Sequence, residues 1–158
     1  MVPCGAAQPN GVTLPPASRE AVEAPYAEIA VGSRASFVRR VVAADIEAFA
    51  ELSGDRSPLH LDESYAATTE MGGRVAHGML IGAFFSQLIG MHLPGRFALH
   101  LSQSLDFVLP VRAGDELEIS GEVLAKQDAT RTIVLRTEAR IVGGDIVARG
   151  RAVVKVLR

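Results

Sequence analysis

A long apolar run extends over residues 77–92, between a polar segment and a series of alternating segments. It predicts a helix that is apolar on nearly every side, a composition typical of a helix enclosed by other elements. The slightly longer apolar stretch over residues 75–93 is long enough to permit a membrane span. Histidines, glycines, Ser86 and Gln87 interrupt the run, however, so we expect a buried core helix. Small residues recur along it at four-residue steps (Gly78, Gly82, Ser86 and Gly90). This stripe serves close packing on a sheet, forms a groove for a thin ligand, or does both.

The chain after this helix alternates between apolar and polar residues. The alternation runs through residues 99–111, 116–123, 132–141 and 146–157, with a Gly143-Gly144 hairpin signal between the last two segments. A period of two over successive strands indicates an antiparallel sheet with one face in water. Glu and Arg alternate on that face, where we expect them to pair across strands and stabilise the sheet.

The chain before the central helix predicts one strand and two short helices. Residues 1–30 are rich in proline and without period, and we interpret them as a flexible extension that precedes a domain over residues 31–158. A strand is expected over residues 36–42. A helix follows from residue 43 to Gly54, and a second one begins at Asp62.

Residues 55–61 are expected to form a loop, because Pro58 disfavours a helical conformation at Ser57. The element order as a whole fits a sheet curled around one apolar helix. This is an α+β architecture with a single core.

Composition and charge disfavour several classes of function. The 158 residues carry a net charge of −2 and no basic run, which disfavours nucleic acid and anionic membranes as partners. Cys4 is the only cysteine, so an intrachain disulfide is impossible. No signal peptide is visible, and we expect a cytoplasmic protein.

A pattern of polar residues precedes the central helix. Asp55 and His60 lie in the segment D-R-S-P-L-H, and His77-Gly78 follows at the start of the helix. An acid and an imidazole suit proton transfer. The first N–H groups of a helix suit the binding of a developing oxyanion, and glycine lets a ligand come close to them. A metal site of Asp55, His60 and His77 matches no common zinc spacing, so we expect none.

Three segments together resemble the MaoC-like (R)-specific enoyl-CoA hydratases. They are D-R-S-P-L-H-L-D, H-G-M-L and S-Q-S-L-D-F-V-L-P-V-R-A-G-D, and the resemblance covers about residues 31–158. It implies the hot-dog fold, in which a curved antiparallel sheet wraps around a long central helix. It also implies that two copies form a homodimer with the active site near the interface.

The resemblance assigns roles to individual residues. Asp55 and His60 match the catalytic pair, and Gly78 matches the glycine whose N–H contacts the thioester oxygen. Ser86 matches a serine near the catalytic pair, and we group it with Ser57 and His77 as substrate-binding residues. Ser57 departs from the pattern, since many members carry Asn there; the hydroxyl still shapes the loop by hydrogen bonding.

The activity implied is hydration of trans-2-enoyl-CoA to (3R)-hydroxyacyl-CoA and the reverse dehydration, without a cofactor. A (3R)-hydroxyacyl-acyl-carrier-protein dehydratase stays open, with the carrier protein as partner. So do a hot-dog acyl-CoA thioesterase and a non-catalytic thioester-binding module. Basic residues would recognise the carrier, and Arg74 and Arg112 are candidates.

Overall fold

The computed structural model describes residues 20–158, so most of the extension expected over residues 1–30 lies outside the described residues. The elements in chain order are η1 (Tyr26–Glu28), β1 (Arg34–Arg40), α1 (Ala43–Ser53), α2 (Pro58–Leu61), α3 (Glu63–Ala67), α4 (Gly78–Gln87), η2 (Leu88–His92), β2 (Ala98–Gln103), β3 (Asp106–Phe107), β4 (Glu116–Gln127), β5 (Thr132–Ile141) and β6 (Ile146–Val156). None of the described helices is long and apolar enough to cross a membrane.

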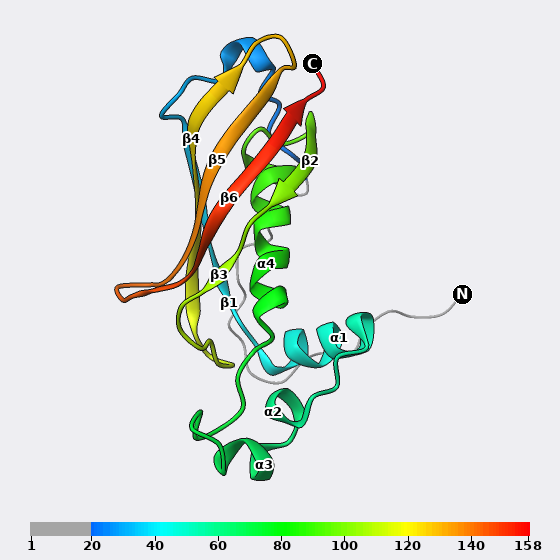
Figure 1. Cartoon of the computed structure of the whole chain (residues 1–158), viewed down its shortest axis with the longest axis vertical. Coiled ribbons are helices and arrows are strands. Elements are labelled where there is room, and N and C mark those ends of the chain that lie inside the picture. The colour runs from blue at the N-terminus through cyan, green and yellow to red at the C-terminus, as the bar shows by residue number, and fades with distance from the viewer. Residues whose placement is uncertain (1–19) are drawn as a thin grey trace, which may run out of the picture.

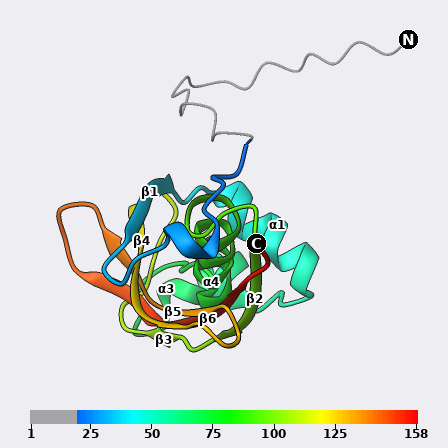
Figure 2. The same cartoon turned by 90° about the horizontal axis from the view of Figure 1, so that it is seen from above.

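The strands form one antiparallel sheet in the order β1-β4-β5-β6-β2, and β3 pairs with β6. The sheet curves around α4, which lies along its concave face (Figures 1 and 2). The predicted α+β architecture is therefore confirmed. Strand β2 stands at one edge and pairs with β6 alone within the described chain.

Alternation along the strands separates the two faces of the sheet. On β4, Leu117, Ile119 and Val123 are buried, whereas Glu118, Ser120 and Glu122 between them are exposed or partly exposed. The predicted pairing of outward charges is present. Arg34 Nη2 lies 3.2 Å from Glu122 Oε1, and Arg136 bonds the other carboxylate oxygen. These two hydrogen bonds, that of Arg34 first, lower the pKa of Glu122.

Helix α4 is the centre of the main apolar core. Leu80, Ile81, Phe84 and Phe85 on this helix are buried against the sheet. A π-helical turn, η2, prolongs α4 into a second apolar cluster with β5 and β6. The side of α4 turned away from the sheet is exposed at Met79, Ala83 and Ser86. The predicted buried helix over residues 77–92 is thus confirmed, with one face left uncovered.

Two segments differ from the sequence-based predictions. The expected loop over residues 55–61 contains the short helix α2. Ser57 is extended, as a residue before proline should be, but Pro58 occupies the first helical position, where its missing N–H costs nothing. The strand expected over residues 99–111 is divided into β2 and β3. The chain leaves β2 after Gln103 and runs from residue 108 to 115 without regular structure.

The segment before β1 packs against the end of the sheet. Ile29 is buried in the second apolar cluster. Lys126 donates to the carbonyls of Tyr26 and Ile29 and lies 4.2 Å from the centre of the Tyr26 ring. Burial and a hydrogen bond to Asp128 raise the pKa of Tyr26 to about 12. These contacts of Tyr26 and Ile29 hold the segment far from α1, α2 and α3, which lie near the start of α4 (Figure 1).

Candidate active site

Asp55 is presented by the end of α1. Gly54 adopts a left-handed conformation with φ of 76°, which stops the helix and turns the chain. The Asp55 N–H donates to Ser53 Oγ at 3.2 Å, and the Asp55 carboxylate accepts the Ser57 N–H through Oδ1 at 3.2 Å. These bonds orient the exposed carboxylate while using one of its two oxygens.

His60 is presented by α2. Ser57 caps this helix by accepting the Leu59 N–H at 3.4 Å. The His60 Nδ1 atom lies 2.8 Å from the carbonyl oxygen of Val75. A carbonyl only accepts, so Nδ1 carries the hydrogen. In the neutral ring, Nε2 then keeps its lone pair for proton transfer.

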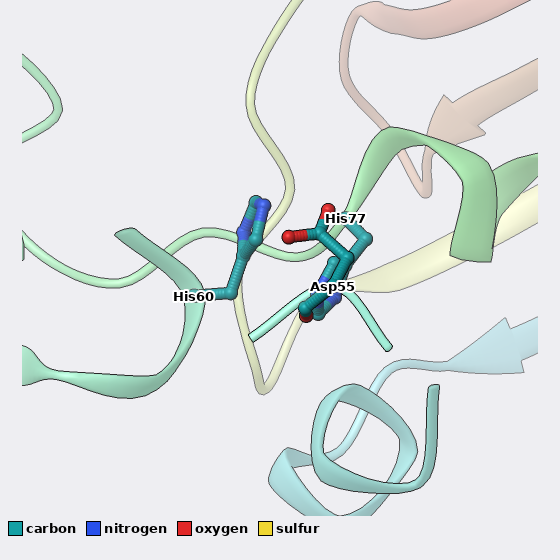
Figure 3. A group of neighbouring side chains, drawn as sticks. All are labelled: Asp55, His60 and His77. Atoms are coloured by element: carbon teal, nitrogen blue, oxygen red, sulfur yellow. The ribbon is translucent and has the colours of Figure 1, made fainter. Parts of the chain in front are cut away.

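His77 contacts both Asp55 and His60. Its side chain is 2% exposed, and its Nε2 donates to the backbone carbonyl of Asp55 at 2.9 Å. Its ring centre lies 3.8 Å from that of His60 and 5.1 Å from that of Phe49. Figure 3 shows the Asp55 carboxylate directed toward His60, with His77 behind.

The three side chains offer ligand atoms that lie within 4.8 Å of one another, as a metal site would require. Each of the two histidines gives one ring nitrogen to a backbone carbonyl and keeps the other. The arrangement suits an acid/base pair, in which a carboxylate and an imidazole share one water molecule.

Gly78 is the first residue of α4, directly after His77. Its N–H belongs to the helix start, where no intrahelical acceptor exists and the helix dipole is positive. A Cβ at Gly78 would lie 2.9–3.0 Å from three ring carbons of Phe107. Glycine is therefore required for the close approach of the β3 ring to the helix start.

An apolar cavity of about 330 Å³ adjoins Gly78. Its lining includes Leu59, Met71, Val75, Ile81 and Phe107. A second hollow, of about 420 Å³, lies on the outer face of the sheet among charged residues of β1, β4 and β5. It contains none of the predicted site residues, whereas the apolar cavity begins at one of them.

The structure thus brings together Asp55, His60, His77 and Gly78, with Ser57 in the same loop. Ser86 lies two helical turns beyond Gly78, about 12 Å along the axis, on the exposed face of α4.

Sequence reasoning missed Phe107 and assigned Arg112 a different role. Phe107 lies in the strand predicted over residues 99–111, and only the tertiary structure places its ring against Gly78. Arg112 was expected at the carrier, but its guanidinium is bonded to backbone carbonyls. Leu80, Phe84, Phe85 and Leu88 are buried in the core, and Ile81 lines the apolar cavity.

Known proteins share this arrangement of sequence and fold. Residues 23–143 match the family described as MaoC like domain. The (R)-specific enoyl-CoA hydratase of Aeromonas caviae is 44% identical over 126 residues, which cover 80% of this chain and 94% of that protein. The 3-hydroxybutyryl-CoA dehydratase of Methylorubrum extorquens is 38% identical over 136 residues, 83% of each chain.

Among solved structures, the unliganded R-hydratase PhaJ1 from Pseudomonas aeruginosa matches with a TM-score of 0.80 at 40% identity, over 85% of this chain and 86% of that one. The predicted hot-dog fold is confirmed by this likeness. Because the family match spans most of the chain and the fold agrees, this protein belongs to the MaoC-like domain family.

Proposed function

We propose that this protein is an (R)-specific enoyl-CoA hydratase, a hydro-lyase that adds water to a trans-2-enoyl-CoA and gives the (3R)-hydroxyacyl-CoA. One observation carries the proposal: the Asp55 carboxylate and the His60 imidazole lie together beside His77 and the start of α4 (Figure 3). The names of two relatives, enoyl-CoA hydratase and hydroxybutyryl-CoA dehydratase, describe the same chemistry in opposite directions.

The proposed mechanism uses one water molecule held between Asp55 and His60. The water oxygen attacks C3 of the enoyl group and loses a proton to the pair, with Asp55 as the general base. C2 then gains a proton from the protonated member of the pair. A positioned acid/base group contributes about 10²–10⁴-fold to such a step.

The thioester oxygen gathers negative charge while C3 is attacked. The N–H of Gly78 is suited to bind it, because it points from the positive end of the α4 dipole. One such donor is worth roughly 3–4 kcal/mol in comparable oxyanion sites. The apolar cavity beside Gly78 takes an apolar part of the substrate. The chemistry adds and removes only water, so we propose no cofactor.

The test is purified protein with crotonyl-CoA. Hydration removes the conjugated enoyl absorbance without releasing free thiol. Thiol release would instead identify a thioesterase and contradict the proposal. Activity on a crotonyl-acyl-carrier-protein but not on the CoA thioester would identify the carrier-protein dehydratase. Binding without turnover would identify a thioester-binding module.

The variant Asp55→Asn tests the assigned base. Asn keeps the acceptor for the Ser57 N–H but not the basicity, so we expect a normal fold and a loss of at least about 10²-fold in kcat. The matched control is Asp62→Asn. Asp62 caps α3 through the Tyr65 N–H, and Asn caps a helix as well as Asp does. Full activity in Asp55→Asn would remove Asp55 from the mechanism.

We further propose that the working unit is a homodimer. Strand β2 has a free edge within the described chain, and Leu99 and Leu101 on it are about half exposed. Met79 on α4 and Phe107 on β3 are exposed to a similar degree. An open strand edge beside apolar side chains is a surface that a second copy covers by symmetric pairing. Such pairing would also enclose the exposed face of α4 that carries Ser86.

We propose a cytoplasmic location for the enzyme. The single cysteine in the sequence suits a reducing compartment. Cell fractionation with an activity assay tests it, and activity in the membrane pellet or the periplasm would contradict it.

A further inference from the structure

Arg112, in the loop between β3 and β4, binds a turn over residues 71–74 that lies far away in sequence. Its Nη1 donates to the carbonyl of Arg74 at 3.1 Å, and its Nη2 donates to the carbonyl of Met71. These two carbonyls flank the pair Gly72-Gly73. The Arg112 backbone is itself held, because its N–H donates to Asp115 Oδ2 at 2.8 Å. The planar guanidinium thus fixes two backbone acceptors at once.

The turn over residues 71–74 is closely packed from the opposite side as well. Gly73 is buried, and a Cβ there would lie 3.0 Å from Glu63 Oε1 and 3.2 Å from Arg112 Nη1. Arg74 reaches across to Glu63 at 3.5 Å and to the Leu61 carbonyl at 3.4 Å. The turn is therefore held between the β3–β4 loop and the α2–α3 segment.

The chain that leaves this turn carries parts of the candidate site. The carbonyl of Val75 accepts the His60 Nδ1 hydrogen at 2.8 Å. The N–H of Ala76 donates to Val111 at 2.6 Å, directly before Arg112. His77 and Gly78 follow without a break. Any shift of residues 71–76 therefore moves the acceptor that orients His60 and the start of α4.

We propose that Arg112 is a positioning residue for the hydration: it orients His60 through the Val75 carbonyl instead of binding the phosphates of the carrier. This inference rests on the proposed function. Both arginines considered as carrier contacts have protein partners here: the Arg112 guanidinium bonds carbonyls of the turn, and the Arg74 guanidinium bonds the Leu61 carbonyl.

The experiment compares two substrates that share the reacting group. Crotonyl-CoA carries the nucleotide and its phosphates, and crotonyl-N-acetylcysteamine lacks them. For Arg112→Ala we expect kcat to fall by about 10²-fold on both substrates, because a displacement of about 1 Å has that effect. The KM values should change by less than about threefold, since the substrate contacts remain. Arg112→Lys should recover part of kcat, because the ammonium reaches one of the two carbonyls. The control is Arg34→Ala, which removes a mostly exposed arginine from the outer face of the sheet.

A rise of KM for the CoA substrate alone, with unchanged kcat, would assign Arg112 to the phosphates and overturn the proposal. Wild-type kcat on both substrates would overturn it too. Amide hydrogen exchange of residues 71–78 supplies a readout without turnover. Faster exchange in Arg112→Ala supports the proposal that Arg112 holds the turn in place, and unchanged exchange refutes it. A wild-type protein inactive on both substrates would refute the proposed function, while the exchange measurement would still decide the role of Arg112.

Discussion

The replacement of Gly78 by Ala separates the chemistry of the site from the packing around it. The added Cβ would lie 2.9 Å from the Phe107 ring, whereas ordinary contact begins at 3.4 Å. The ring or the helix start must therefore move by about 0.5 Å, the difference between the two distances. A displacement of about 1 Å at an active site costs on the order of 10²-fold in rate. We expect kcat to fall by about 10–100-fold, or roughly 1.4–2.7 kcal/mol of transition-state stabilisation.

Stability should respond much less to this change. Phe107 is 50% exposed, so the displacement at the helix start disrupts little buried packing. We expect the free energy of unfolding to change by less than about 1 kcal/mol. Gly121→Ala is the matched control. Its Cβ would lie equally close, 2.9 Å, to Leu88 Cδ2, but Leu88 is fully buried. Overpacking there should cost about 1–3 kcal/mol of stability and leave kcat nearly unchanged.

The assay combines initial rates on crotonyl-CoA with urea unfolding of both variants. The double variant Gly78→Ala/Phe107→Ala adds a further check, because removal of the ring removes the clash and should restore part of the lost rate. Wild-type kcat in Gly78→Ala would refute the reasoning, since it would mean that the helix start lies away from the reacting atoms.

Three more outcomes are expected. His77→Ala should lose about 2–5 kcal/mol of stability by urea unfolding and lower kcat, because the buried ring supports both Asp55 and His60; a stable, fully active variant would contradict this. Leu101→Lys should sediment as a monomer at micromolar concentration where the wild type sediments as a dimer, and a monomeric wild type would reject the proposed pairing. Glu122→Gln should have a lower Tm than the wild type at about pH 6. The difference in Tm between the two proteins should become smaller at about pH 3. The lowered pKa of Glu122 stabilises the fold above the ordinary glutamate value of about 4.3, and this contribution disappears as the pH falls through the lower value. A difference in Tm that does not change with pH would show that the ion pairs of Glu122 with Arg34 and Arg136 do not stabilise the fold.

Much of the fold follows from local pattern. The alternation of Leu117, Ile119 and Val123 with charged residues predicts a half-buried strand, and the structure buries those three side chains. The stop of α1 at Gly54 and the cap of α3 by Asp62 were predictable, because each depends on residues within a few positions. The break between β2 and β3 was not predictable, because the apolar alternation continues through it. Only the pairing with β6 defines where each strand ends.

Local pattern is sufficient to predict the components of the site: an acid and an imidazole in one loop, a glycine at the start of an apolar helix, and alternating strands to enclose that helix. The positions of these components relative to one another depend on contacts between distant segments. His77 supports the Asp55 backbone from 22 positions away, and Val75 orients His60 from 15 positions away. Arg112 reaches the Met71 carbonyl across 41 positions, and Phe107 covers Gly78. Each of these contacts joins segments that no local pattern relates, because their distance depends on how the sheet closes around α4.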